Sequence, residues 1–393
     1  MLAPKLRFKE FNDEWKKIKL QKLLKFKNGI NASKESYGHG VKYISVGDIL
    51  NNNYITYDNI KGLVDIDENT LNENAVHYGD IVFQRSSETF EDIGQANVYL
   101  DKNKIATFGG FVIRGKKISD YDPIFFNYLL KSPLSRKSII VKGAGAQHYN
   151  ISQEELEKIS LYFPNLYEQQ KIGKFLSVLD KKIELQQRKI EVLKMYKRGL
   201  INKLYTSLDC SEVQIKDIGE VITGTTPSKD NLSYWSNGTI VWVTPSDITE
   251  FKNISDSQIH LTPQGLNAGR KLPKNTLLIT CIASIGKNAV LKVAGSCNQQ
   301  INAIIPYSGY DIDFLYYLFE YKKLYMQSIA GTSATSIINK SSFEKILLKI
   351  PNISVQKNIA KNLSTIDYKI EIQQHLLDRL IAFKKSLLQQ MFI

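Results

Sequence analysis

The sequence predicts an α+β protein with a pseudo-twofold internal repeat, in which two α/β units are separated by two long helices that form an antiparallel coiled coil. Two observations predict this fold. The stretch that starts at Glu157 recurs from Glu344, 187 residues later, with 17 of 31 positions identical. Each copy follows a set of short β-type runs and one aromatic-rich helical run, an order that is typical of α+β packing.

The boundaries lie where the similarity between the two halves changes from loose to strong. The loosely similar stretches are 1–165 and 208–352, and the strongly similar ones are 166–207 and 353–393. Pro164 and Pro351 stand just before the two strongly similar stretches. Proline restrains the residue before it, which suits the start of a helix. We therefore expect a variable unit, a long helix, a second variable unit and a second long helix.

The short β-type runs and the helical runs occupy matching places in the two variable units. The β-type runs are KYISVGDI, GDIVFQR and FVIRG in the first unit, and TIVWVTPSDI, TLLITCI and NAIIPY in the second. The aromatic-rich helical runs start at Pro123 and at Ile312. Aromatic residues at helical spacing are more often core than surface, so we expect both helices to be buried.

Both strongly similar stretches carry the residue spacing of a coiled coil. Apolar residues step by four and three from Ile172, and again from Ile359, over about five heptads without an internal proline. The predicted seam positions are Ile172, Leu176, Leu179, Ile183, Gln186, Ile190 and Leu193 in the first helix, and Ile359, Leu363, Ile366, Ile370, Gln373, Leu377 and Leu380 in the second.

Polar residues in the seam indicate how the two helices pair. Gln186 and Gln373 occupy the same position in the two copies, as do Lys197 and Lys384. Antiparallel pairing places both glutamines near the midpoint, where they can approach each other. Parallel pairing would stack the lysines at one level, where like charges repel. We therefore expect antiparallel pairing within the chain, with a zipper between two chains as the alternative.

Each variable unit has three loops with small, polar and basic residues, which suit contact with nucleic acid. Their backbone N–H, hydroxyl and amide groups can bind phosphates and base edges, and Arg and Gln suit bidentate contacts with guanine and adenine. The candidate DNA-binding residues are Lys34, Arg85, Ser86, Lys142, Gln147 and His148 in the first unit, and Ser228, Lys229, Arg270, Lys287, Ser333 and Thr335 in the second. For each residue taken singly, a solvated loop without such contacts is the alternative.

The composition favours a cytoplasmic protein with a polyanionic partner. The chain has 393 residues, 52 Lys and Arg against 39 Asp and Glu, and a net charge of +13. Three widely spaced cysteines argue against a disulfide framework. We expect no membrane span and no secretion signal, because long apolar runs are missing. The long-helix stretches 167–206 and 353–393 hold 16 basic and 7 acidic residues, so most of the excess charge lies there.

Motifs of catalysis and metal binding are missing from the sequence. There is no GxxxxGK[ST] phosphate loop, and there is no Asn-Pro-Pro-aromatic or acidic-Pro-Pro-aromatic motif of an amino-methyltransferase. The five histidines have no metal-ligand spacing with one another or with cysteine. Asp80 and Glu88 could be nuclease carboxylates, but no basic partner follows at a suitable spacing. We expect a non-catalytic chain with no metal site and no cofactor of its own.

The sequence resembles the specificity subunit of type I restriction–modification systems over essentially its whole length. The resemblance is carried by the opening PKLRFKEFNDEWKKIKL, by GTTPSKDNLSYW followed by VWVTPSDI, and by the PNxxxQ helix start that occurs twice. It implies that 1–165 and 208–352 are target-recognition domains, each reading half of a bipartite, asymmetric sequence in double-stranded DNA. The helices would then act as a spacer between the half-sites.

The resemblance also implies partners. The two similar helical stretches would offer equivalent docking surfaces to two modification (methyltransferase) subunits, and restriction (translocase and nuclease) subunits would join them. S-adenosylmethionine, ATP and Mg²⁺ would belong to those partners. The sequence departs from the family in ending almost together with the second helical stretch, and we expect the N-terminal residues Met1–Glu14 to pack beside that helix instead. Two alternatives from other classes are an autonomous DNA methyltransferase or nuclease, and an assembly protein that does not read DNA.

Overall fold

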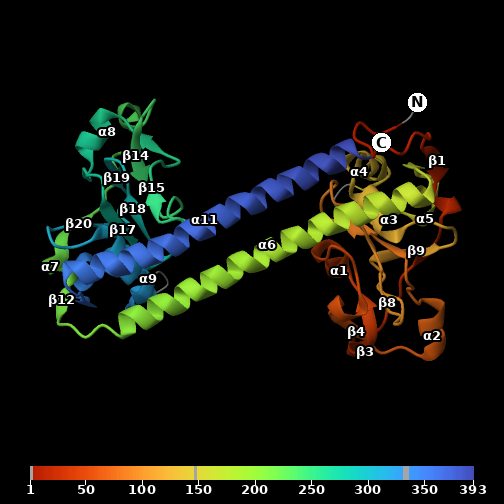
Figure 1. The fold of residues 1–393 in the computed structure, drawn as a ribbon, viewed down its shortest axis with the longest axis horizontal. Coiled ribbons are helices and arrows are strands. Elements are labelled where there is room, and N and C mark those ends of the chain that lie inside the picture. The colour runs from red at the N-terminus through yellow and green to blue at the C-terminus, as the bar shows by residue number, and fades with distance from the viewer. Residues whose placement is uncertain (1–2, 146–147, 331–335) are drawn as a thin grey trace. The chain divides into compact units, whose positions relative to one another are not determined.

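The computed structural model describes residues 3–145, 148–330 and 336–393. The chain divides into two compact units, Met1–Gln187 with Leu376–Ile393, and Arg188–His375. The long helices are α6 (Leu166–Thr206) and α11 (Ile353–Gln390), and each contributes to both units (Figure 1). Each compact unit therefore combines one variable unit with parts of both long helices.

The first unit is built on an antiparallel four-stranded sheet of order β2-β9-β5-β7 and a three-stranded sheet of order β4-β3-β8. In the smaller sheet β3 is antiparallel to β4 and parallel to β8. Two-stranded ladders join β1 to β11 and β6 to β10. The strands are β1 (Lys16–Lys19), β2 (Leu24–Asn28), β3 (Tyr37–Ile44), β4 (Gly62–Val64), β5 (Ile81–Gln84), β6 (Ser86–Ser87), β7 (Ala96–Val98), β8 (Thr107–Phe108), β9 (Val112–Lys117), β10 (Tyr149–Asn150) and β11 (Ser160–Phe163).

The helices of the first unit are α1 (Val46–Asn51), α2 (Glu68–Glu73), α3 (Pro123–Lys131), α4 (Pro133–Ile140) and α5 (Gln153–Lys158). Helix α3 is the aromatic-rich helix that the sequence predicts. Its N-cap Asp122 accepts a hydrogen bond from the Phe125 N–H at 2.7 Å, and proline occupies its first turn. Phe125, Phe126 and Leu129 are fully buried, so this helix is core, as predicted.

The second unit repeats this topology with two differences: its larger sheet has a fifth strand, β15, and a single bridge between Ile282 and Ile337 stands in place of the β6–β10 ladder. Its larger sheet has the order β13-β20-β17-β18-β15, its smaller sheet the order β16-β14-β19, and β12 pairs with β21. As in the first unit, the central strand of the smaller sheet has one antiparallel and one parallel neighbour. The strands are β12 (Glu212–Gln214), β13 (Gly219–Thr223), β14 (Ile240–Val243), β15 (Asn253–Ile254), β16 (His260–Leu261), β17 (Thr276–Thr280), β18 (Asn288–Leu291), β19 (Gly295–Cys297), β20 (Ile301–Pro306) and β21 (Leu347–Lys349).

The helices of the second unit are α7 (Ile215–Ile218), α8 (Pro263–Ala268), α9 (Ile312–Ile329) and α10 (Lys340–Glu344). Helix α9 corresponds to α3 and is capped in the same way, because Asp311 accepts from the Phe314 N–H at 2.9 Å. Its aromatic residues Phe314, Tyr317 and Phe319 are buried against β17 and β18. The second aromatic-rich helix is therefore core as well.

The long helices pair with opposite direction in both units. In the first unit Asp180 of α6 forms an ion pair with Lys384 of α11 at 2.5 Å. In the second unit Lys197 of α6 forms an ion pair with Asp367 of α11 at 2.5 Å. The beginning of α6 therefore lies beside the end of α11, and the end of α6 lies beside the beginning of α11. The pairing is antiparallel, as the sequence predicts.

All fourteen predicted seam residues are buried or half-buried. Ile172, Leu176 and Leu179 share one core with Leu387 of α11, and Ile359, Leu363 and Ile366 share another with Ile201 of α6. Gln186 is 9% exposed and Gln373 is half-buried. The close approach of these two glutamines stays a prediction.

The N-terminal segment packs on both long helices of the first unit. The Leu6 N–H donates to the Gln390 carbonyl at 2.9 Å, at the end of α11. Arg7 forms a bidentate ion pair with the fully buried Glu168 of α6, and both N–O distances are 2.7 Å. The described part of Met1–Glu14 therefore contacts the end of the second long helix, and also the start of the first.

Candidate nucleic-acid interface

Three loops of the first unit meet through backbone hydrogen bonds. Loop 1 follows β2, loop 2 follows β5, and loop 3 follows α4. In loop 1 the Ile30 N–H donates to the Phe108 carbonyl at 3.0 Å, at the end of β8. In loop 2 the Arg85 N–H donates to the Phe111 carbonyl at 2.8 Å, and the Arg85 carbonyl accepts from the Ile151 N–H of loop 3 at 3.0 Å. The backbone of Arg85 therefore links the turn before β9 to loop 3.

A cavity of about 360 Å³ lies where these loops meet. Its lining includes Asn28 from the end of β2, Arg85 from loop 2 and Lys142 from loop 3. The Arg85 side chain is half-buried, and its Nη1 donates to the Gly110 carbonyl at 3.3 Å. Two of the predicted DNA contacts, Arg85 and Lys142, therefore share one concave site.

Acidic residues from α5 line the same cavity and offset part of its positive charge. Lys142 forms an ion pair with Glu155 at 3.4 Å, and Lys158 forms a second ion pair with the same carboxylate at 2.7 Å. Hydrogen bonds from Lys158 and then Lys142 hold the pKa of Glu155 below its usual value. The charge of Lys142 is thus partly offset by a carboxylate that it shares with Lys158, whereas no ion pair with an acidic residue is seen for Arg85 among the described residues.

The second unit builds the corresponding site from the same backbone hydrogen bonds. The Thr225 N–H donates to the Cys297 carbonyl at 2.9 Å, which matches the bond between Ile30 and Phe108. The Cys281 N–H donates to the Gln300 carbonyl at 2.8 Å, and the Cys281 carbonyl accepts from the Ile338 N–H at 2.9 Å. Cys281 therefore takes the place of Arg85, and Gln300 takes the place of Phe111.

The remaining predicted contacts of the first unit lie outside the cavity lining. Lys34 is exposed on a short 3₁₀ helix (Lys34–Ser36) in loop 1. Ser86 of β6 donates to the Asn150 side chain, which ties loop 2 to loop 3. His148 is exposed in loop 3. Gln147 lies outside the described residues. The structure therefore brings Arg85, Ser86 and Lys142 together, and Lys34 does not line their cavity.

Four of the predicted contacts of the second unit are described, and all four are exposed on three separate segments. Ser228 and Lys229 lie in loop 1, where the Ser228 carbonyl accepts from the Trp235 indole at 2.9 Å. Arg270 follows helix α8, and Lys287 lies in loop 2, where its N–H donates to the Thr280 hydroxyl at 3.0 Å. Ser333 and Thr335 lie outside the described residues.

The turn that precedes β9 in the first unit and β20 in the second was not predicted from the sequence. Its members are Gly109, Gly110 and Phe111, or Asn298, Gln299 and Gln300. In the second unit the Thr226 hydroxyl donates to the Gln299 side chain, which links this turn to loop 1. The available signal was that both triplets lie at the start of, or just before, a predicted β-type run, FVIRG or NAIIPY, at matching places of the repeat.

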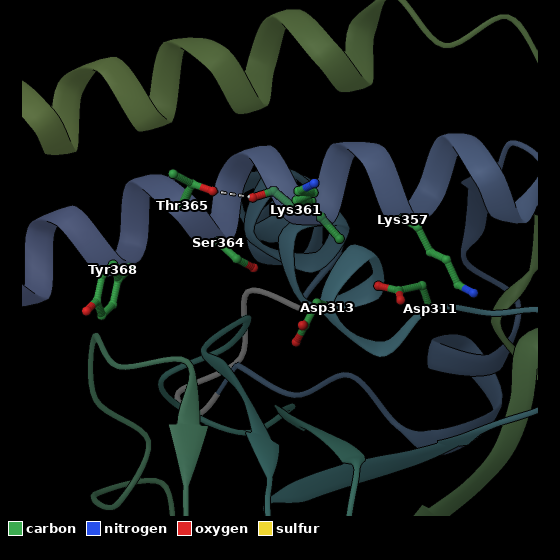
Figure 2. Close-up of a pocket in the computed structure, with 8 residues that line it drawn as sticks. Asp311, Asp313, Lys357, Lys361, Ser364, Thr365 and Tyr368 are labelled. Atoms are coloured by element: carbon green, nitrogen blue, oxygen red, sulfur yellow. Dashed lines mark hydrogen bonds between the residues drawn. The ribbon is translucent and has the colours of Figure 1, made fainter.

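A second cavity, of about 490 Å³, lies in the second unit between the starts of α9 and α11. Figure 2 shows Asp311 and Asp313 on one side, and Lys357, Lys361, Ser364, Thr365 and Tyr368 along α11 on the other. Asp313 also forms an ion pair with Lys252 at 3.2 Å. The cavity has both signs of charge and contains none of the predicted DNA contacts, so we do not assign it to DNA.

Metal binding and membrane insertion find no support in the described part of the chain. Within residues 3–145, 148–330 and 336–393, no cluster of three or more His, Cys, Asp and Glu residues could hold a metal ion. Over the same residues, no helix combines the length and apolar character that a membrane span needs.

A family model described as the type I restriction modification DNA specificity domain matches residues 12–195 and 208–381. The two matches cover both variable units and most of both long helices. The chain belongs to this family. It is a family of DNA-recognition domains and not of enzymes, so this specificity subunit serves to recognise DNA sequence within a type I system.

Curated relatives agree with this assignment. The specificity subunit is 26% identical to the putative type I restriction enzyme MjaX specificity subunit of Methanocaldococcus jannaschii, over 96% of this chain and 93% of that protein. It is 37% identical to the MjaIX specificity subunit of the same organism, over 40% of this chain and 38% of that protein. It is 30% identical to the EcoR124I/EcoR124II specificity subunit of Escherichia coli, over 40% of this chain and 41% of that protein.

Solved structures share the fold over nearly the whole chain. The S subunit of a type I restriction–modification system from M. genitalium aligns with a TM-score of 0.61 at 18% identity, covering 100% of this chain and 99% of that one. A chain from a structural study of complex assembly and conformational transition in the type I system aligns with a TM-score of 0.63 at 13% identity. The alignment covers 95% of this chain and 96% of that one. The fold of the specificity subunit, two similar α+β units with two long helices, is therefore that of these S subunits.

Proposed function

We propose that this specificity subunit reads a bipartite, asymmetric target in double-stranded DNA, with one half-site for each unit. The observation that carries the proposal is the repeated three-loop site. Both units hold loops 1, 2 and 3 with the same backbone hydrogen bonds, yet they present different side chains at equivalent positions. A shared frame with different side chains suits two readers of two unlike base sequences.

Base identity in the first half-site is read chiefly by Arg85 in this proposal. Its guanidinium presents a planar set of donors that fits the O6 and N7 acceptors of guanine. Ser86, Lys34 and His148 would anchor phosphates around it. In the second unit the proposed contacts are Ser228, Lys229, Arg270 and Lys287, which are all exposed. They are proposed to read base edges and to bind phosphates.

The long helices are proposed to set the spacing between the half-sites. Helix α6 has 41 residues, so at about 1.5 Å per residue it is about 60 Å long. It has no internal proline, which would kink it. Its basic residues and those of α11 would also attract DNA without reading its sequence.

Partner subunits are proposed to dock on repeat-equivalent apolar residues of the long helices. Leu185 in the first unit and Ile372 in the second are equivalent, and they are 55% and 44% exposed. Two equivalent surfaces fit two modification (methyltransferase) subunits, which would bring S-adenosylmethionine. Restriction subunits would bring ATP and Mg²⁺. The specificity subunit itself would bind none of these cofactors.

The complex is proposed to act in the cytoplasm, where its DNA lies. Cys210, Cys281 and Cys297 are all free thiols, which suits a reducing compartment. Burial raises the pKa of Cys281 and of Cys297 to about 12, so both thiols stay protonated and unreactive at neutral pH.

The test is to map methylated adenine and cytosine across DNA that has been modified by the assembled complex. We expect one motif made of two defined half-sites and a fixed, unspecified spacer. Replacing residues 208–352 with the matching unit of another specificity subunit should change one half-site and leave the other unchanged. A single continuous motif would contradict the proposal, as would methylation or cleavage of DNA by the purified subunit alone.

A further inference from the structure

An exposed phenylalanine stands at the meeting point of the recognition loops in the first unit. Phe111 is 68% exposed and is the last residue before β9. Its carbonyl accepts from the Arg85 N–H, and the preceding Gly110 carbonyl accepts from Arg85 Nη1. Single exposed apolar residues are common on proteins. Phe111 differs from such residues because packing and hydrogen bonds hold the turn on which it lies.

Backbone hydrogen bonds, such as that from the Gly109 N–H to the Ile44 carbonyl at 3.1 Å, hold this turn, and side chains pack closely against it on two sides. A Cβ atom on Gly109 would collide with the hydroxyl of Tyr43, and a Cβ atom on Gly110 would collide with the side chain of Asn31. Asn31 belongs to loop 1, so the turn is held between loop 1 and Arg85 of loop 2. Two glycines in succession allow this approach. Phe111 therefore projects from a rigid support beside the arginine proposed to read guanine.

The second unit keeps the backbone of this turn and changes its side chains. Gln300 stands where Phe111 stands, since both carbonyls accept from the equivalent N–H of loop 2. The Asn298 side chain donates to the Gln300 side chain at 3.0 Å, which orients that amide. An aromatic ring in one unit thus corresponds to an amide in the other, which is the variation expected at positions that read different bases.

We propose that Phe111 is a specificity-determining residue whose ring packs against the 5-methyl group of a thymine in the first half-site. This proposal rests on the proposed function of the first unit. Phenylalanine has no hydrogen-bonding group, and the thymine methyl is the apolar group on a base edge in the major groove. The second half-site would have an adenine opposite Gln300, because an amide suits the N6 and N7 groups of that base.

The test replaces each thymine of the first half-site, one at a time, by uracil, which lacks only the methyl group. The protein is the full-length subunit within its complex, and the probe is the duplex target defined by methylation mapping. We expect the wild-type complex to bind one of the uracil duplexes about fourfold more weakly, the effect of one buried methyl group. Phe111→Ala should bind the thymine and uracil forms of that duplex equally well.

Ile118→Ala is the matched control. Ile118 is an exposed apolar residue, 54% exposed, directly after the other end of β9. Its variant should discriminate thymine from uracil as the wild type does. The proposal is overturned if the wild-type complex binds every uracil duplex like its thymine counterpart, as insertion of the ring between base pairs would allow. It is also overturned if Phe111→Ala keeps the discrimination.

The outcome is separable from that of the proposed function. A wild-type complex that recognises no bipartite target would contradict the proposed function before any uracil duplex is made. Because Phe111 is exposed, its replacement by alanine should leave the melting temperature of the subunit unchanged. A retained melting temperature with lost discrimination therefore supports a contact with the base.

Discussion

Arg85 and Cys281 occupy one backbone position in the two units, yet their side chains differ in charge, size and exposure. Arg85 is half-buried and lines the cavity between the loops. Cys281 is buried, and the Asn302 side chain donates to its sulfur at 3.3 Å. A role assigned to one residue therefore does not transfer to its equivalent in the other unit. In the proposed function the second unit uses other residues at this point, such as the exposed Lys287 of the same loop.

Replacing Arg85 tests direct reading at this position. Arg85→Ala should weaken specific binding by about 1–3 kcal/mol and relax specificity at one base pair of the first half-site. Arg85→Lys should keep the salt dependence of binding, because it keeps the charge, but it should lose the same base specificity. Competition binding with all four bases at each position measures both effects. If Arg85→Ala instead lowered the affinity equally for all four bases at every position of the half-site, Arg85 would be a phosphate contact.

Lys131, at the end of α3, makes the stability of the first unit depend on pH. Burial, together with the nearby Lys384, lowers the pKa of Lys131 to about 8. In the unfolded chain this pKa is about 10.4, so between pH 8 and 10.4 the unfolded chain binds more protons than the folded chain. The contribution of Lys131 to the free energy of unfolding is therefore lowest below pH 8, and it rises with pH across this window.

The variant Lys131→Gln removes this titration. It can keep the hydrogen bond that the Lys131 ammonium donates to the Asn53 carbonyl at 2.9 Å. We expect the melting temperature of the wild type, minus that of the variant, to increase between pH 8 and pH 10. Thermal unfolding of both proteins at several pH values measures this difference. If the two plots of melting temperature against pH were parallel, Lys131 would keep its ordinary pKa in the folded state.

At the scale of elements, the two long helices are joined by two equivalent ion pairs. Asp180 and Asp367 are 187 residues apart, and so are Lys197 and Lys384. Each aspartate pairs with the lysine of the other copy. Each also accepts a hydrogen bond from a tyrosine hydroxyl, from Tyr128 at 2.7 Å and from Tyr317 at 2.5 Å. The tyrosines belong to α3 and α9, so each cluster fastens a variable unit to both long helices.

Reversing one charge in such a cluster should destabilise the unit that contains it. Asp180→Lys places a positive charge beside Lys384, where both side chains are largely shielded from water. We expect a loss of about 3 kcal/mol in the stability of the first unit. The double variant Asp180→Lys/Lys384→Asp restores opposite charges and should recover much of this loss. Thermal unfolding provides the measurement, and a double variant as unstable as the single one would contradict the ion-pair assignment.

Elements with a strong periodic signal could be predicted from the sequence, whereas the turns between them could not. The four-three spacing and the repeat predicted both long helices, and the lysines at equivalent seam positions predicted their antiparallel pairing. The turn that carries Phe111 has only three residues and no periodicity. Its position depends on contacts with Asn31 and Tyr43 that lie far away in the sequence. Gln300 was missed for the same reason.

At the scale of the whole molecule, the net charge and the residues proposed to read DNA sequence lie in different parts of the chain. The long-helix stretches hold most of the net positive charge, while the loops of the variable units hold the varied side chains. General attraction to the DNA backbone and discrimination among bases can therefore be changed separately. Neutralising lysines on the helices should lower affinity for all DNA and leave the recognised sequence unchanged.

Shortening both long helices by one heptad tests their proposed role as a spacer. Removing residues 186–192 and 372–378 shortens each helix by about 10 Å, the rise of roughly three base pairs. A whole heptad keeps the seam nearly in phase, because seven residues complete almost two turns. We expect methylation mapping to find a shorter spacer between two unchanged half-sites. An altered half-site, or an unchanged spacer, would contradict the spacer role.

The main-chain bonds that hold the recognition loops have a consequence for how such a subunit evolves. The bonds from Ile30, Arg85 and Ile151, and their counterparts in the second unit, all join one peptide group to another. They use no side-chain atoms, although glycine at positions such as Gly109 is needed for the close approach of the loops. Exposed side chains on these loops can therefore be exchanged one at a time while the bonds are kept. If these side chains read DNA as proposed, each exchange changes the recognised sequence and leaves the fold intact.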